Sequence, residues 1–341
     1  MDKNAPIGVF DSGVGGLTVA REIMRQMPAE NIVYFGDTAR VPYGSKTPET
    51  IVRYTRQILR FLEGKQVKAA VVACNTASAL GLPAILAERE AAQACVCADG
   101  AEEGKGQAGE ACVCEDGRQD GVKTQIPHYL DASFPLLGVL EPGAKVAAAA
   151  TQRGRIGVIA TEATVCSGSY EAAIRRFLPE AKVVSQPGPL LVPLVEEGML
   201  SDPVTEEMVR RYTEGFRAAG VDTLILGCTH YPLLRRVFRR IMGEDVTLVN
   251  PAYETAIALK EELASRGLLR EAGALGEVPG NAFRSRTAKT AGAPPGGAWA
   301  AEMNPAHEFY VSDGAERFVR FAREILPVPV ESASVVRIEE Y

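Results

Sequence analysis

Two cysteines occupy nearly the same local sequence about half the chain apart. Cys74 follows the apolar residues 71–73, and Cys228 follows the apolar residues 224–227. In both places a buried-strand pattern ends in a small residue and then the thiol, with amide or hydroxyl side chains directly after it. Two thiols that face one carbon atom from opposite sides can remove a proton on one side and deliver one on the other. The pair therefore favours an enzyme that inverts a stereocentre.

Each cysteine has a simpler alternative, a buried thiol that packs as a small apolar side chain. The duplicated placement favours catalysis, because ligands of parallel α/β sheets bind outside the carboxyl ends of the strands. Cys74 and Cys228 would then line one crevice. Each also precedes an expected helix start, where the helix dipole and free N–H groups favour a thiolate.

A glycine-rich turn at residues 11–16 follows the first expected strand. It lacks the lysine of a P-loop and the full dinucleotide spacing, and Asp37 is the one acid near the end of the second strand that could bind a ribose. Two interpretations remain open. The turn lets the backbone approach a small anionic substrate that Asp11 and Ser12 face, or it is a tight turn in which Asp11 only caps a helix.

His230 lies two residues after Cys228 and could move a proton or hold a thiolate. A purely structural histidine is an equal alternative. His128 and His307 lie beside the segments that interrupt the pattern, and we expect no chemistry from them.

Short apolar runs alternate with helical patterns, which is typical of parallel α/β units. Thr47 is expected to cap a helix that begins at Pro48, and Asp202 begins another that closes at Gly220. The expected strands are residues 7–10, 31–36, 67–73, 155–161 and 224–227. Three helices are expected: one that follows the glycine-rich turn and ends near residue 24, one at residues 48–64, and one at about residues 202–219. The separation of Ile7 from Cys74 is close to that of Ile156 from Cys228, so we expect an internal repeat.

Two stretches, residues 92–126 and 271–305, do not follow the alternation of strands and helices, and we expect them to be inserted surface loops. The first contains two Cys-x-Cys pairs, Cys95 with Cys97 and Cys112 with Cys114. Zinc ligation is an alternative, but structural zinc sites use wider spacing within each pair, so we expect no metal. Trp299 in the second stretch is expected to be incidental packing.

Composition excludes several classes of function. The chain has 341 residues, 46% of them hydrophobic, and a net charge of −6, so we expect no bulk attraction to nucleic acid or to an anionic membrane. There is no apolar stretch of membrane-spanning length. Seven cysteines and the lack of a secretory signal pattern favour a reducing compartment, and we expect a cytoplasmic protein.

The motifs together resemble the glutamate racemase family, cofactor-independent enzymes that supply D-glutamate for bacterial peptidoglycan. The similarity covers about residues 1–91, 135–270 and 307–325. The segments that carry it are residues 8–18, 34–44, 73–78, 192–196 and 226–233. Two rivals remain: a racemase for another amino acid such as aspartate, and a non-catalytic sensor that binds a small carboxylate.

The resemblance implies that Cys74 and Cys228 are the catalytic acid/base pair, that Asp11 assists near Cys74, and that Glu196 and His230 assist near Cys228. It also implies a set of residues that bind L- or D-glutamate: Asp11, Ser12, Tyr43, Gly44, Asn75, Thr76, Thr161, Thr164, Thr229 and His230. It implies no cofactor, no metal and a homodimer.

The fold implied by the resemblance is α/β, with two similar domains of mostly parallel sheets, related by a pseudo-twofold axis, and the active site in the cleft between them. The first domain would be residues 1–137 completed by residues 251–341, and the second would be residues 138–250.

Overall fold

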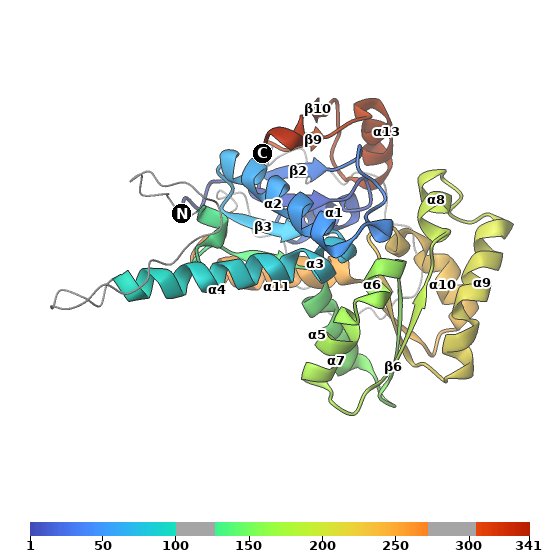
Figure 1. Ribbon diagram of the computed structural model, residues 1–341. Helices are drawn as coiled ribbons and strands as arrows, with labels where there is room; N and C mark the ends of the chain where they lie inside the picture. The colour runs from blue at the N-terminus through green and yellow to red at the C-terminus, as the bar shows by residue number, and fades with distance from the viewer. Residues whose placement is uncertain (100–126, 272–304) are drawn as a thin grey trace.

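The structure, a computed structural model, describes residues 1–99, 127–271 and 305–341 and contains two parallel β-sheets covered by helices (Figure 1). The strands of the first sheet are β1 (Ile7–Asp11), β2 (Ile32–Gly36), β3 (Ala69–Val72), β4 (Leu136–Gly138), β9 (Glu308–Val311) and β10 (Ser334–Val335). Those of the second are β5 (Arg155–Ala160), β6 (Lys182–Pro187), β7 (Thr223–Gly227) and β8 (Thr247–Val249). The predicted α/β class with two mostly parallel sheets is confirmed.

The two sheets share a strand order. The first is β10-β9-β2-β1-β3-β4 and the second is β6-β5-β7-β8, so the order β2-β1-β3-β4 recurs as β6-β5-β7-β8. Strands β1 and β3 pair in parallel, as do β5 and β7. Since parallel strands end at the same edge of a sheet, Cys74 after β3 lies near Asp11 at the end of β1.

Helices cover both faces of each sheet. The helices are α1 (Leu17–Gln26), α2 (Pro48–Gly64), α3 (Asn75–Leu80), α4 (Leu82–Asp99), α5 (Leu140–Ala150), α6 (Glu162–Cys166), α7 (Ser169–Phe177), α8 (Leu191–Glu196), α9 (Pro203–Ala218), α10 (Arg235–Met242), α11 (Pro251–Ser265) and α13 (Ala315–Ile325). Short 3₁₀ helices are η1 (Tyr43–Ser45), η2 (His128–Leu130), η3 (Tyr231–Leu234) and η4 (Ile338–Glu340).

One apolar core is shared between the sheets. It joins Val9 on β1 and Val158 on β5 to residues of α1, α5 and α11. Helix α11 packs against both α1 and α5, and Figure 1 shows α11 and α5 between the first sheet and the second half of the chain. Separate cores fill the outer faces, one under α2 and α3 and the other under α8, α9 and α10. The shared core holds the two cysteine-bearing sheets together.

The predicted helix starts are confirmed at the level of single hydrogen bonds. The Thr47 hydroxyl accepts from the Thr50 N–H and Pro48 begins α2, where its missing N–H costs nothing. The Asp202 carboxylate accepts from the Val204 N–H at the start of α9.

The expectation of a loop from residue 92 is wrong for its first part, because α4 continues to Asp99. Residues 87–94 are mainly alanine, glutamate, glutamine and arginine, which are strong helix formers. Cys95 and Cys97 lie on the last turns of this helix. Cys112, Cys114 and Trp299 lie outside the described residues, as do residues 100–126 and 272–304.

Strands β9 and β10 come from the C-terminal part of the chain and extend the first sheet beside β2. The domain boundaries at residues 137/138 and 250/251 stay predictions. Across the described parts of the chain, every helix is too short or too polar to cross a bilayer.

Candidate active site

Cys74 is the residue that directly precedes α3, at the carboxyl end of β3, and its side chain is buried. Ser12 and the backbone N–H of Ala77 lower the pKa of its thiol. Burial, and then the charge of Asp11, raise the pKa of the Cys74 thiol to about 12. The helix N–H lowers this pKa as expected, but burial outweighs it. The local preference of a helix start for a thiolate is therefore outweighed at Cys74, whose raised pKa favours the neutral thiol.

Asp11 is fully buried and organises the glycine-rich turn. Its Oδ2 accepts from the Gly13 N–H at 3.0 Å, and its Oδ1 accepts from the Thr229 hydroxyl at 3.4 Å. Burial raises the pKa of Asp11, against the opposing charge of His230 and these hydrogen bonds. Helix α1 has Gly16 and not Asp11 at its cap position. Asp11 accepts from the Gly16 N–H at the start of α1, and its contact with Thr229 shows that its role extends beyond this helix start.

Cys228 follows β7 and is also buried. Its Sγ lies 3.8 Å from His230 Nδ1, and His230 Nε2 lies 3.1 Å from Glu196 Oε1 on α8. The structure thus aligns a thiol, an imidazole and a carboxylate. The expected helix start after Cys228 is wrong in detail, because the next element is the short 3₁₀ helix η3, which begins at Tyr231.

His230, which lies beside Cys228, and Glu196 each favour the charged form of the other. Burial lowers the pKa of His230. Its contacts with Cys228 and Glu196 outweigh burial, so that the pKa is raised to about 10. The hydrogen bond from His230 lowers the pKa of Glu196, and Arg317 on α13 adds to this effect from 3.4 Å. An imidazolium beside Cys228 and a carboxylate behind it are the favoured forms at neutral pH.

The glycine-rich turn packs closely against the loop that carries Cys228. A Cβ added to Gly15 would overlap Thr229 Oγ1 and lie 2.5 Å from His230 Nδ1. The Thr18 hydroxyl donates to the Thr229 carbonyl at 2.9 Å. Only glycine at residue 15 allows this approach, so the turn joins the two cysteine-bearing halves.

Residues directly after Cys74 are held by the second half of the chain. Thr76 Oγ1 lies 3.0 Å from Thr161 Oγ1 and 3.4 Å from Thr164 Oγ1. The Tyr170 hydroxyl donates to Asn75 Oδ1 at 2.7 Å. The structure thus brings together the predicted substrate residues of α3 and α6.

Asp37 has no role as a ribose ligand in this structure. It is fully buried, and its oxygens accept from Arg40 Nε at 2.7 and 2.9 Å, from the Ser312 hydroxyl at 2.9 Å and from the Tyr43 hydroxyl. These contacts hold the loop that carries Tyr43 and Gly44. A Cβ on Gly44 would lie 3.1 Å from Thr161 Cβ, so this loop also borders the second half of the chain.

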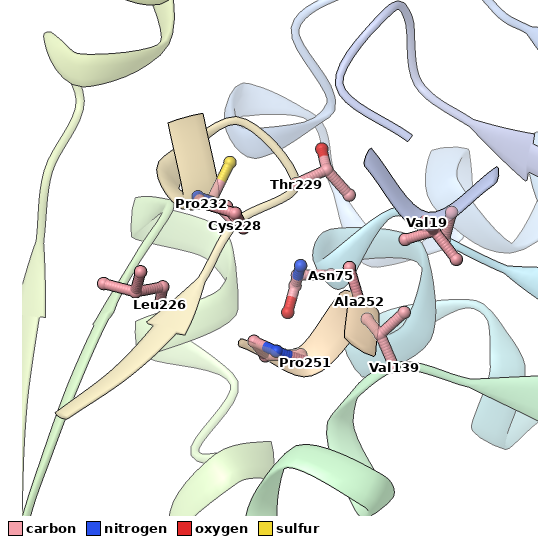
Figure 2. Close-up of a pocket in the computed structure, with 10 residues that line it drawn as sticks. Val19, Asn75, Val139, Leu226, Cys228, Thr229, Pro232, Pro251 and Ala252 are labelled. Carbon is pink, nitrogen blue, oxygen red and sulfur yellow. The ribbon is translucent and has the colours of Figure 1, made fainter. Parts of the chain in front are cut away.

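A narrow cavity opens beside the cysteine loops (Figure 2). Its lining residues are Val19, Ala73, Asn75, Val139, Leu226, Cys228, Thr229, Pro232, Pro251 and Ala252. Its volume is about 10 Å³, room for about one water molecule. Of the predicted site residues, Asn75, Cys228 and Thr229 line it.

Sequence reasoning missed three residues of this region: Tyr170, Thr18 and Arg40. Each acts through a predicted site residue or its loop, and two of the three contacts join segments distant in sequence. A buried tyrosine or threonine carries no local signal for such a contact, since its partner depends on the tertiary fold.

Comparison with known proteins places this chain among the racemases. The family model described as Asp/Glu/Hydantoin racemase matches residues 130–258. A glutamate racemase of Geobacter metallireducens is 46% identical over 264 residues, which are 77% of this chain and 82% of that protein. On this similarity, the chain belongs to the glutamate racemase family, a family of isomerases.

Solved structures of glutamate racemases have a similar fold. Glutamate racemase isoform RacE1 from Bacillus anthracis is 32% identical, with a TM-score of 0.70 over 98% of this chain and 97% of that one. Glutamate racemase from Francisella tularensis, solved in complex with D-glutamate, is 29% identical, with a TM-score of 0.71 over 99% of this chain and 100% of that one.

Proposed function

We propose that this enzyme interconverts L- and D-glutamate by transferring protons at the α-carbon between Cys74, Cys228 and the substrate. The observation that carries the proposal is the junction of the two cysteine loops, where Thr229 after Cys228 contacts Asp11 beside Cys74. The complex of the Francisella relative with D-glutamate supports the choice of substrate.

The two enantiomers have equal free energy in water, so racemisation needs no energy source. The enzyme only has to lower the barrier to removal of the α-proton. One cysteine takes the α-proton as a thiolate, and the other delivers a proton from its thiol to the opposite face. The neutral thiol of Cys74 suits the delivering role. The charge of His230, 3.8 Å from Cys228 Sγ, stabilises negative charge on that sulfur. In the reverse direction the two roles exchange.

The carbanion that forms beside the carboxylate must be stabilised by fixed hydrogen-bond donors, because the proposed reaction uses no cofactor and no metal. Asn75, Thr76 and Thr229 are the donors nearest the two cysteines in sequence. A donor that already binds the carboxylate in the ground state contributes mainly to substrate binding. Further contacts to the amino acid are proposed for the loop and cap residues Asp11, Ser12, Tyr43, Gly44, Thr161, Thr164 and His230. Asp11 assists proton transfer at Cys74, and Glu196 with His230 assists at Cys228.

We infer that the two halves move apart when substrate enters. The cavity beside Asn75 and Cys228 holds about one water molecule, much less than an amino acid. The contacts that must loosen are the hydroxyl cluster of Thr76, Thr161 and Thr164 and the Thr229–Asp11 bond. Hydroxyl contacts of this kind are suited to exchange for hydrogen bonds to a ligand.

We propose further that the product serves peptidoglycan synthesis, and that the enzyme acts in the cytoplasm as a homodimer without nucleic-acid or membrane partners. The domains would be residues 1–137 with 251–341, and residues 138–250.

The test is solvent deuterium incorporation at the α-carbon, followed by NMR. Incorporation into both L- and D-glutamate without added cofactor is expected, with L-aspartate and L-alanine as comparison substrates. Binding of glutamate without any incorporation would favour the sensor. Faster exchange of aspartate would favour the rival racemase, and strict dependence on pyridoxal phosphate or metal would contradict the mechanism.

A further inference from the structure

Tyr170 on α7 contacts the neighbours of both cysteines although it belongs to neither loop. Its hydroxyl donates to Asn75 Oδ1 at 2.7 Å, and Asn75 directly follows Cys74. Its ring lies against Gly227, which directly precedes Cys228: a Cβ added to Gly227 would lie 3.0 Å from Tyr170 Cε2. The side chain is only 2% exposed. Tyr170 is therefore packed between the two places where the proposed chemistry occurs.

The hydrogen bond fixes which end of the Asn75 amide faces the cavity. An asparagine amide has one oxygen that accepts and one NH₂ group that donates. Tyr170 occupies the oxygen, so the NH₂ group is left for a ligand. Figure 2 shows the Asn75 nitrogen toward the loop of Cys228 and Thr229, with the oxygen turned away from it.

The Tyr170 hydroxyl carries the proton that this hydrogen bond requires. Burial, and then the nearby Cys228, raise the pKa of Tyr170, so its hydroxyl keeps its proton at neutral pH and donates. If the Asn75 amide turned over, its oxygen would face the substrate carboxylate and repel it. A donor at this position instead attracts the carboxylate.

We propose that Tyr170 is a positioning residue that holds the Asn75 amide with its NH₂ group toward the α-carboxylate of the amino acid. This inference rests on the proposed function. It predicts weaker substrate binding when the hydroxyl is lost, because the carboxylate is bound in both the ground state and the transition state.

The test begins with Tyr170→Phe, assayed in both directions. KM is expected to rise roughly three- to tenfold, the effect of one hydrogen bond, with kcat nearly unchanged. A merely structural role would lower kcat through loss of folded enzyme and leave KM unchanged. Tyr253→Phe is the matched control, since Tyr253 is 41% exposed on α11, and it should behave as the wild type.

A double-mutant cycle shows whether Tyr170 acts through Asn75. In the Asn75→Ala background, Tyr170→Phe is expected to raise KM no further. The same four variants are compared by titration with D-glutamate in the Cys228→Ser background, so that the cycle is complete even where turnover is slow. An unchanged affinity in Tyr170→Phe, or an equal loss with and without Asn75, would overturn the inference. An inactive wild type would instead contradict the proposed function.

Discussion

The hydroxyl of Thr229 donates to the carboxylate of Asp11, with 3.4 Å between Oγ1 and Oδ1. Thr229 directly follows Cys228, whereas Asp11 ends β1 and its charge raises the pKa of Cys74. This bond therefore joins the surroundings of one cysteine to those of the other. It also places a buried carboxylate where it opposes the thiolate form of Cys74.

Replacing Asp11 is expected to make Cys74 easier to deprotonate. Asp11→Asn removes the negative charge that, after burial, contributes most to the raised pKa of Cys74. The pKa of Cys74 should fall from about 12, so its thiolate forms at lower pH. The measurement is thiolate ultraviolet absorbance against pH, with the signal of Cys74→Ser variants subtracted. An unchanged titration would show that Asp11 does not act on this sulfur.

Each cysteine is expected to be necessary for racemisation. Cys74→Ser or Cys228→Ser should reduce kcat roughly 10²–10⁴-fold, because serine is a much weaker acid and the proton transfer on that side loses its catalyst. Exchange of the α-proton of one enantiomer is expected to survive in a single variant. Cys166→Ser is the matched control, since Cys166 is an exposed free thiol on α6. Wild-type turnover in either active-site variant would end the two-base proposal.

A methyl group at residue 15 is expected to damage the site without unfolding the protein. In Gly15→Ala, the new Cβ would overlap Thr229 Oγ1 and crowd His230, so both side chains must move. A displacement of about 1 Å near reacting groups can cost roughly 10²-fold in rate.

The control for that substitution is Gly215→Ala on α9. A Cβ there meets nothing within 4 Å, and alanine in a helix interior is favoured over glycine by about 1 kcal/mol. Its activity should be unchanged and its melting temperature slightly higher. Equal losses of activity in the two variants would remove the role assigned to the close approach of Gly15.

Stability is expected to depend on pH through His230. The folded protein raises the pKa of this imidazole from 6.5 to about 10. The stabilisation from its protonated form is therefore complete below pH 6.5 and is lost as the pH rises through about 10. Melting temperatures of the wild type and His230→Asn should differ most below pH 6.5 and converge as the pH rises through about 10.

His128→Asn serves as the comparison, because His128 is exposed on η2. Its melting temperature at neutral pH should equal that of the wild type. A difference between the wild type and His230→Asn that stays constant across the alkaline range would contradict a protonated His230.

The sequence alone determined much of the architecture. Apolar runs at residues 7–10 and 224–227 predicted strands, and Thr47 and Asp202 predicted helix starts, which the structure confirms. These signals are local, because strand alternation, helix spacing and capping involve residues within a few positions of one another. The prediction was wrong at residues 92–99 for the same reason. The glycine and acidic residues after residue 99 suggested a loop, although the helix formers at residues 87–94 continue α4 to Asp99.

The tertiary structure decided the chemical state and the partners of the site. A thiol at a helix start favours the thiolate locally, yet Cys74 is a neutral thiol, because its burial and the charge of Asp11 depend on how distant segments pack. The pairing of His230 with Glu196 and the contact of Tyr170 with Asn75 arise in the same way. Electric fields and hydrogen bonds act through space, and distances in space are set only when the two sheets come together around their shared core.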